Sequence, residues 1–577
     1  MAWHTTSIAT AMVGALLALA SCRSNDAPAT PSASTGPRRG GALVASIRSE
    51  PTTYNRYLPH GAGAATEAVT LLTQARLARV NRVTDALEPW LAEGWTLAAD
   101  GVTYTVRLRE GITFSDGQPL TSDDVLFSFR VAYDPKVASP LASGLKVNGK
   151  PVEVTKIDAR QFTVRFPEPF APGLRLIDNL PILPKHKLEA VLDAGQFASV
   201  WTPSKPLTDV VGLGPFLLTE HVAGQRLVFT RNPRYFRRDA AGQQLPYLDK
   251  LTLAVIPDQN TEALRLEAGE VDLMTNADIR PQDHAAFKRL TEQNRLKMIE
   301  VSVGLDPDFL SFNLRAAPHA QKRPRWWTRK EFRQAISCGV DRQAIVNTVY
   351  LGAAVPIFGP VTPGNRTWHA ADAPACALDR AKAKQLFATA GISDRNGDGQ
   401  LEDAAGHVVR FSMITQAGHL RERVSSVLQD QLKQLGIAVD IVPLDPGGIF
   451  QRWQKGDYDA IYFGLQASST DPALNGDFWL SSGAYHFWNP SQPTPATPWE
   501  RRVDELMREQ ATAADLSGRQ RAFAEIQRIL GDELPSIYFV APRVTLATSP
   551  RVVNPTPAPQ IPQLLWSVDT LAAADAR

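Results

Sequence analysis

The amino-acid sequence predicts a mixed α/β (α+β) fold built from several domains. The chain has 577 residues, 44% of them hydrophobic, which is enough for a large core and, on length alone, for about two to four domains. Two patterns predict the fold class. A period-2 alternation near Val102 indicates a strand with one buried face, and a helix–strand–helix–strand order between residues 424 and 464 indicates parallel strands.

The strand pattern near Val102 predicts a hairpin followed by a helix. From Val102 to Arg109 apolar and polar residues alternate, and Asp100-Gly101 supplies a tight turn before them. A second turn is expected at Ser115-Asp116-Gly117. Thr121 or Ser122 then caps the predicted helix.

The later part of the chain has the pattern of βαβ units. Thr328 and Glu331 have the spacing of a capping box for a helix that buries Phe332, Ala335 and Ile336. A second helix shows one apolar face, made of Val424, Val427, Leu428, Leu432 and Leu435.

That second helix ends at Gly436 and is followed by a predicted strand at Ile437–Val442. A further helix at Gly447–Lys455 and a strand at Asp459–Gly464 repeat the order. Such connections imply parallel strands.

The first residues resemble a lipoprotein signal. An apolar run, Ile8 to Ala20, is too short to span a bilayer and leads into Leu19-Ala20-Ser21-Cys22, so we expect cleavage before Cys22 and lipidation of that residue. Met1 to Ser7 contains no Lys or Arg, which departs from the usual basic start of such a signal. An ordinary secretory signal with an incidental Cys22 is the alternative. Residues Ser24 to Gly41 are small and Pro-rich, as in a flexible tether.

The charge pattern excludes few partners, but it disfavours nucleic acid. The net charge is +2, and basic residues are not concentrated among aromatic ones. The densest basic stretch, Lys322 to Lys330, contains Trp326 and Trp327 and is either a solvated loop before a helix or a contact for a partner such as a permease. We expect a monomer.

Besides Cys22, the chain has only Cys338 and Cys376. In an oxidising compartment these two cysteines form a disulfide, or else Cys338 is a small buried residue in a helix.

Two other motifs imitate known sites. Asp394 to Leu401 has several positions of a calcium loop, but Ala405 stands where the bidentate carboxylate belongs, so a Gly-rich turn is the favoured interpretation. Gly144 to Lys150 imitates a phosphate-binding loop, but Pro151 replaces the required Ser or Thr, so Asn148-Gly149 is read as a hairpin turn. No cofactor is expected.

Four groups of motifs, spread along the chain in one order, carry a family resemblance. They are Leu87 to Val125, Gly212 to Phe216 followed by Arg231 to Tyr235, Leu245 to Asp249 with Gly269 to Asp272, and Phe332 to Ala335 with Val340 to Ile345. In these motifs the chain resembles the extracellular solute-binding proteins, family 5, which are the binding lipoproteins of peptide-, oligopeptide- and nickel-type ABC importers.

The resemblance implies a two-lobed periplasmic-binding-protein fold with a cleft, a hinge and an extra small α+β domain. The implied segments are 1–21 signal peptide, 22–41 tether, 42–75 with 180–302 and 521–577 discontinuous lobe I, 76–179 extra small domain, and 303–520 lobe II. It also implies a lipid-anchored protein of the periplasm or cell envelope that binds a solute without catalysis.

The expected ligand region runs from Phe463 to Trp488, where aromatic and polar residues are dense. In peptide-binding members of the family an Asp in this region holds the ammonium group of the peptide, and the aligned residue here is Ser468. Either Asp471 or Glu50 takes over that role, or the ligand has no free amino terminus. The expected contact residues are Glu50, Tyr54, Asn55, Ser468, Thr470, Asp471, Trp479, His486 and Trp488.

Within this set, Trp479 and Trp488 suit a core as well as a cleft, and a lone His486 more often makes an ordinary hydrogen bond than a metal bond. The predicted function is capture of an oligopeptide or similar polar solute for an ABC permease. A ligand-sensing receptor and a binder of a non-peptide solute are the alternatives. The sequence shows no motif of a hydrolase, such as Gly-x-Ser-x-Gly or His-Glu-x-x-His, so we expect no enzyme.

Overall fold

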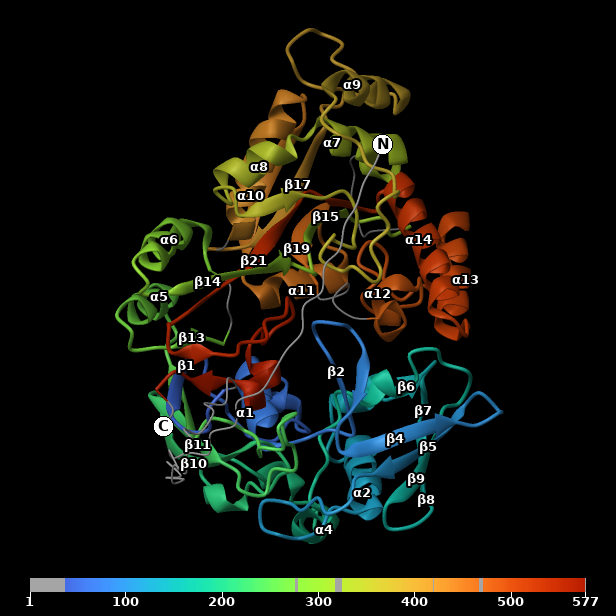
Figure 1. The fold of residues 1–577 in the computed structure, drawn as a ribbon. Helices are drawn as coiled ribbons and strands as arrows, with labels where there is room; N and C mark the ends of the chain where they lie inside the picture. The colour runs from blue at the N-terminus through green and yellow to red at the C-terminus, as the bar shows by residue number, and fades with distance from the viewer. Residues whose placement is uncertain (1–36, 276–278, 317–323, 419, 466–470, 576–577) are drawn as a thin grey trace, which may run out of the picture. The chain divides into compact units, whose positions relative to one another are not determined.

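The computed structural model of the chain describes residues 37–275, 279–316, 324–418, 420–465 and 471–575 (Figure 1). Contacts divide the chain into residues 1–37 and 38–577, and the fold below is that of the second unit. The predicted signal and tether, with Cys22, lie outside the described residues, as do Ser468 and Thr470. The mixed α/β fold class is confirmed.

The larger sheet has eight strands and joins distant parts of the chain. Its strands, in spatial order, are β10 (Phe216–Val222), β11 (Arg226–Arg231), β12 (Lys250–Val255), β1 (Ala42–Ile47), β13 (Leu273–Met274), β21 (Val540–Thr548) and β14 (Lys297–Val303), with β16 (Ala354–Pro356) paired to β21. Strand β1 is parallel to both β12 and β13. The carboxyl ends of these three strands therefore lie at one edge of the sheet.

The second sheet has five strands and contains the predicted βαβ units. Its order is β18 (Ala438–Leu444), β17 (Arg410–Gln416), β19 (Ala460–Gly464), β15 (Asp308–Phe312) and β20 (Ser536–Tyr538). Strand β17 is parallel to β18 and β19, which confirms the parallel arrangement expected from the sequence. Strand β20 pairs in this sheet, whereas the next strand along the chain, β21, pairs in the larger sheet. The domain boundaries expected from the sequence stay predictions.

A third sheet of four strands contains the predicted hairpin. Its order is β4 (Ala92–Leu97), β5 (Thr103–Leu108), β9 (Gln161–Arg165) and β8 (Glu153–Lys156). Strands β4 and β5 form the predicted hairpin, and helix α2 (Ser122–Tyr133) follows with Thr121, one of the two predicted caps, as its N-cap. Thr121 and Asp124 form a capping box, which was not predicted. The phosphate-loop imitation is a hairpin of β6 (Lys146–Val147) and β7 (Lys150–Pro151), also as predicted.

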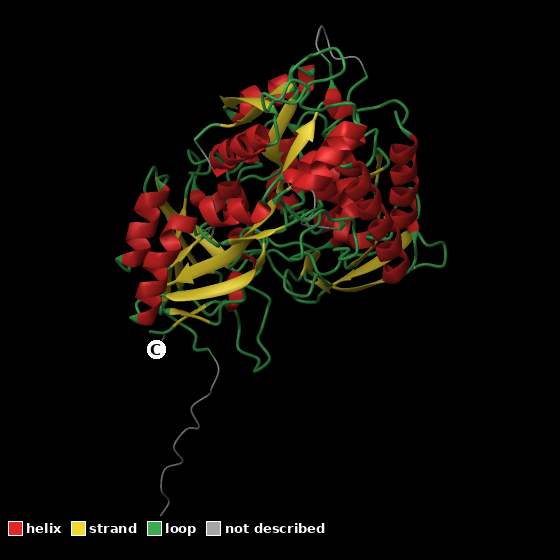
Figure 2. Ribbon diagram, turned by 90° about the horizontal axis from the view of Figure 1, so that it is seen from above, coloured by secondary structure: helices red, strands yellow, loops and turns green. Residues whose placement is uncertain are grey.

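The remaining elements are helices and two small strand pairs. Figure 2, coloured by element type, shows helices packed beside the strands and long loops between them. The pairs are β2 (Ala78–Val80) with β3 (Leu87–Pro89), and β22 (Val552–Val553) with β23 (Ala572–Ala573). The other helices are α1 (Ala64–Thr73), α3 (Leu141–Gly144), α4 (Lys185–Asp193), α5 (Gln259–Glu267), α6 (His284–Glu292), α7 (Lys330–Gly339), α8 (Arg342–Thr348), α9 (Arg380–Thr389), α10 (Leu420–Gln434), α11 (Pro446–Lys455), α12 (Gly476–Trp479), α13 (Pro498–Thr512) and α14 (Leu516–Glu533). None of the helices in the described ranges is both long and apolar enough to cross a bilayer.

The capping box predicted at Thr328 is wrong. Helix α7 begins at Lys330 with Arg329 as its N-cap, and the Thr328 hydroxyl donates to the carbonyl of Arg325 instead. A short 3-10 turn at Trp326–Thr328 places Thr328 one residue too early to cap the helix. Both tryptophans of this basic stretch are buried, so they add no aromatic surface to it.

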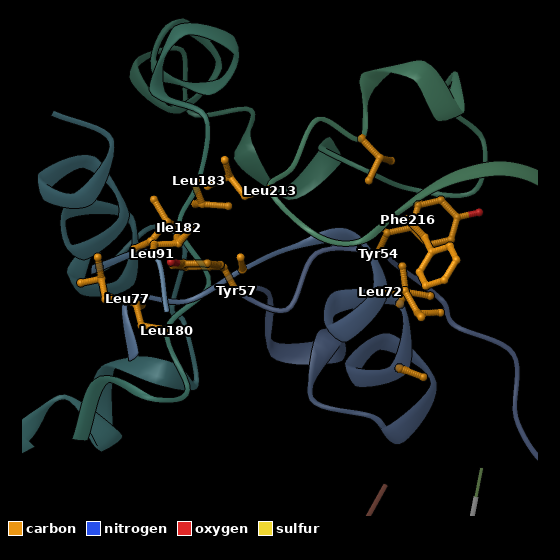
Figure 3. Packing of buried hydrophobic residues seen from close by; sticks show 14 of the residues in the cluster. Tyr54, Tyr57, Leu72, Leu77, Leu91, Leu180, Ile182, Leu183, Leu213 and Phe216 are labelled. Carbon is orange, nitrogen blue, oxygen red and sulfur yellow. The ribbon is translucent and has the colours of Figure 1, made fainter. Parts of the chain in front are cut away.

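The core of the first part of the chain joins the larger sheet to the four-stranded region (Figure 3). Tyr57 lies among leucines of several segments, while Leu72 packs beside Phe216. The motif from Gly212 to Phe216 has a steric reason. A Cβ on Gly212 would lie 2.0 Å from the carbonyl oxygen of Thr73, and a Cβ on Gly214 would lie 2.4 Å from the carbonyl carbon, so only glycine permits this close approach to α1.

Local geometry decides the cysteine alternative and describes the hydrogen bonds of the calcium-like loop. Cys338 and Cys376 form a disulfide that closes a 38-residue separation. In the calcium-like loop, Asp394 accepts hydrogen bonds from the amides of Gly397 and Gly399, and Asn396 accepts one from Asp398, as in a turn. The described part of the chain contains no group of three metal-ligating side chains.

Candidate ligand-binding site

Two sheet edges are the natural places for a binding site. In parallel sheets, ligands bind outside the carboxyl ends of the strands, because loops diverge there and leave room. One such edge follows β1, and the other follows β17 and β19. Each edge carries a small cluster of charged side chains.

The Glu50 cluster, which consists of Glu50, Tyr54 and His221, lies just after the carboxyl end of β1. Glu50 accepts a hydrogen bond from Nε2 of His221 at 2.5 Å and another from the amide of Gly224 at 3.0 Å. The Tyr54 hydroxyl lies 2.5 Å from Nδ1 of the same ring. His221, which the sequence did not single out, therefore connects two of the predicted residues.

Burial affects the protonation of the Tyr54 hydroxyl. Burial and the charge of Glu50 raise the pKa of Tyr54 to about 12, so its hydroxyl keeps its proton and donates it to Nδ1. On the other side of the ring, Nε2 of His221 donates to the carboxylate of Glu50. The Glu50 side chain is 32% exposed, so its charge remains accessible to a cationic group of a ligand.

Asn55, the next predicted contact residue, lies in the interior rather than in the Glu50 cluster. Its side chain is fully buried, and its Oδ1 accepts a hydrogen bond from the amide of Tyr57 at 3.0 Å. Asn55 holds the turn that leads away from the Glu50 cluster, where its short polar side chain replaces a backbone acceptor.

The Arg421 cluster, which consists of Asp308, Gln416, Arg421 and Phe463, lies at the carboxyl ends of β17 and β19. Arg421 donates to one oxygen of Asp308 at 3.0 and 2.8 Å and to Gln416 at 2.6 Å. Its guanidinium lies 4.5 Å from the centre of the Phe463 ring. Burial lowers the pKa of Arg421, but the neighbouring Asp308 outweighs this effect and holds the pKa above its ordinary value.

Asp471 lies within the predicted ligand region and is already paired. Its side chain is 4% exposed, and its Oδ1 lies 2.5 Å from Nη2 of Arg519. The same carboxylate accepts the amide of Ala473 at 3.1 Å and the side-chain amide of Gln510 at 3.4 Å. A ligand ammonium would have to compete with a buried guanidinium for this charge.

Trp479, His486 and Trp488 lie in the interior. His486 and Trp488 both donate toward one oxygen of Glu500, at 3.3 and 3.2 Å, and Gln492 adds a third donor at 2.9 Å. Trp479 packs edge-on against Phe523, with ring centres 5.1 Å apart. The other ring nitrogen of His486 lies 3.3 Å from the carbonyl of Phe478, so the ordinary hydrogen-bond interpretation describes this histidine.

The structure thus divides the predicted contact residues. Glu50 and Tyr54 come together around His221, whereas Asp471, His486 and Trp488 belong to buried networks with side chains of α13 and α14. Sequence reasoning missed His221, Arg421 and Asp308. No strand was predicted before Arg421, so the sequence reasoning did not point to it; in the structure it follows the parallel strand β17 by a few residues, where ligand-binding groups gather.

The comparisons with known proteins identify the family of the chain and its fold. Residues 86–487 match the family model described as bacterial extracellular solute-binding proteins, family 5 Middle. A probable ABC transporter-binding protein of Deinococcus radiodurans is 27% identical over 518 residues, which cover 86% of each chain. The oligopeptide-binding protein AppA of Bacillus subtilis is also 27% identical, over 89% of this chain and 88% of its own.

The solved structure of the same AppA protein, in complex with a nonapeptide, superposes with a TM-score of 0.69 and 25% sequence identity over 93% of this chain and 100% of its own. The relatives are substrate-binding transport proteins rather than enzymes. The chain therefore belongs to the bacterial extracellular solute-binding proteins of family 5.

Proposed function

We propose that the protein is the lipid-anchored binding component of an ABC importer and captures an oligopeptide or a similar polar solute for its permease. The ligand is held between the two sheet edges that carry the Glu50 and Arg421 clusters. Closure of two lobes on the ligand is the signal to the permease, since a ligand that contacts both lobes stabilises the closed form. Cys22 supplies the lipid anchor.

One observation carries the proposal: the chain aligns over most of its length with an oligopeptide-binding protein whose structure holds a nonapeptide. The clusters add a chemical argument. Glu50 offers a partly exposed carboxylate for an ammonium group. Arg421 pairs with Asp308 and is 25% exposed, so its remaining N–H groups can donate to a carbonyl or carboxylate oxygen of the solute.

Because Ser468 stands where peptide-binding relatives have an acid, the chemical class of the ligand is tested first. Without an acid at that position, a buried ammonium needs another anion, because an unpaired buried charge costs on the order of several kcal/mol. We propose Glu50 for this role, since Asp471 already pairs with Arg519. Tyr54, Ser468 and Thr470 are proposed as further contacts.

Native mass spectrometry of the protein purified from its host tests the proposal. We expect a set of bound masses that match peptides and leave on mild activation. A single non-peptide mass would move the ligand to another solute class. Absence of any bound mass, together with no calorimetric signal from a defined peptide panel, would refute the proposal.

The lipid anchor is tested separately. Intact mass of the membrane-extracted protein should show a diacylated or triacylated Cys22, and a Cys22→Ser variant should move to the soluble fraction. A soluble wild-type protein cleaved at another position would contradict the anchor and leave the binding proposal standing.

A further inference from the structure

A groove of about 670 Å³ lies on the four-stranded region, on elements that contribute no residue to the Glu50 or Arg421 clusters. One wall is a single face of α2, with Leu126, Arg130 and Tyr133 at helical spacing. The opposite wall is strand β8, and Lys185 of α4 contributes to the rim. Its volume is within the range of ligand sites, roughly 300 to 1,000 Å³.

Strand β8 is an edge strand, and its hydrogen-bonding pattern can be worked out from the register. Glu153 pairs with Arg165 and Thr155 with Thr163, and the amide of Ile157 donates to the carbonyl of Gln161 in the same series. In an antiparallel pair only alternate residues bond to the partner strand. The amide and carbonyl groups of Val154 and Lys156 therefore point away from β9, toward the open edge.

An edge of this kind, next to a helix, is a template for one more strand. An extended peptide that lies between β8 and α2 gains main-chain hydrogen bonds from Val154 and Lys156 and places alternate side chains against the helix. Leu126 and Tyr133 on one wall and Val154 on the other are half-buried, which gives an apolar surface for one such side chain.

The charges on the rim define the partner further. Lys156 pairs with Asp123 at 2.7 Å, and Arg130 pairs with Glu189 and Asp193 on α4. Glu153, in contrast, is exposed and has no ion pair with any residue that the structure describes. A basic residue of the peptide would complement it.

We propose that this groove binds an extended segment of a partner protein by strand addition to β8, with an apolar residue over Leu126 and a basic residue next to Glu153. The site is independent of solute capture and goes beyond the proposed function. A partner protein fits better than a free solute, because the groove is open, charged at its rim and built along a strand edge, the features of a transient docking surface.

The probe is a phage-displayed library of random octapeptides, panned on the purified soluble protein, with enriched sequences resynthesised and measured by fluorescence polarisation. We expect enriched peptides to carry an apolar residue beside Lys or Arg. Val154→Pro removes the outward amide without loss of a bond to β9 and should weaken binding about tenfold or more. Val154→Ala keeps the amide and is the matched control, with a change of about threefold or less.

Leu126→Lys should abolish the binding, and circular dichroism with a melting curve checks that each variant is folded. Equal losses in Val154→Pro and Val154→Ala would contradict strand addition. The proposal also fails if enriched peptides bind Leu126→Lys as well as the wild type. A dimer in light scattering that Val154→Pro dissociates would show that a second copy occupies the edge, and would overturn the proposal.

Discussion

Among the carboxylates that pair with a histidine in the described residues, Glu500 and Glu50 lie in opposite surroundings. Glu500 is 2% exposed and its partner His486 is fully buried, while the side chain of Glu50 is 32% exposed beside His221. Glu500 receives hydrogen bonds from several side chains of the interior, and Glu50 keeps part of its surface in water. The same residue types thus form a structural network in one region and an accessible charge in the other.

From this difference we assign Glu500 to the stability of the fold and Glu50 to recognition of the ligand. A buried carboxylate persists only when enough donors replace its lost hydration, so removing a donor or the charge affects folding. A partly exposed carboxylate costs little to maintain and remains available to a ligand. We therefore expect substitutions around Glu500 and Asp471 to change stability, and substitutions at Glu50 to change affinity.

The largest effect is expected from Arg519→Met, which leaves the buried Asp471 without its cation. The free energy of unfolding should fall by about 3 to 5 kcal/mol, because an uncompensated charge remains in the interior. Urea unfolding followed by circular dichroism measures it. The double variant Arg519→Met with Asp471→Leu is the control and should recover most of the loss. A loss below about 1 kcal/mol in the single variant would show that the pair is not a structural anchor.

Glu500→Gln should lower the free energy of unfolding by about 1 to 3 kcal/mol near neutral pH. Burial raises the pKa of Glu500, but hydrogen bonds from His486, Gln492 and Thr497 outweigh it and hold the pKa below its ordinary value of 4.5. The stability from this charge is therefore present above the unfolded-state pKa and is lost as the pH falls through the lower folded-state pKa.

Urea unfolding of the wild type and of Glu500→Gln across this pH range checks the sign. The difference between the two proteins should shrink as the medium becomes acidic. A difference that grows toward acidic pH would mean that Glu500 is protonated in the folded protein.

Glu50→Gln tests the partly exposed carboxylate of the comparison. Glutamine keeps an acceptor for His221 but removes the charge, so affinity for the natural ligand should fall about tenfold, which is about 1.4 kcal/mol. The melting temperature should hardly change, since the side chain is partly exposed. Isothermal titration calorimetry measures the affinity, and Glu220→Gln on the same strand as His221 is a matched surface control.

The smallest effect is expected from Tyr54→Phe. The variant loses one buried hydrogen bond to His221 and should be destabilised by about 1 kcal/mol, as measured by urea unfolding. Affinity should change less than in Glu50→Gln, because the carboxylate and its bond to His221 remain. A larger loss of affinity than in Glu50→Gln would place the tyrosine hydroxyl itself on the ligand.

Local patterns predicted much of the fold. The hairpin of β4 and β5, helix α2 with its cap, and strands β18 and β19 depend on residues close in sequence, and all are present. Strand β17, which lies between β18 and β19 and is parallel to both, was not predicted. The cap at Thr328 failed for a local reason as well, since a short 3-10 turn occupies the residues before α7.

The site was harder to predict because burial depends on distant partners. The stretch that ends at Trp488 has the composition of a binding region, yet Asp471 is paired with a residue 48 positions away and His486 with one 14 positions away, both on helices that pack over this stretch. Likewise, Glu50 meets His221 across 171 residues. No rule of sequence spacing predicts such pairs. The packing of α13, α14 and β10 brings their members together.

The most direct test of this account is to release the natural ligand from the purified protein and titrate it back into the wild type, Glu50→Gln and Glu500→Gln, with melting temperatures measured in parallel. The account predicts that Glu50→Gln binds about tenfold more weakly at an unchanged melting temperature. It predicts that Glu500→Gln melts several degrees lower and keeps its affinity within about threefold. If Glu500→Gln lost affinity while Glu50→Gln bound normally, the ligand would sit among the buried aromatic residues, and the assignment of recognition to the exposed sheet edges would be wrong.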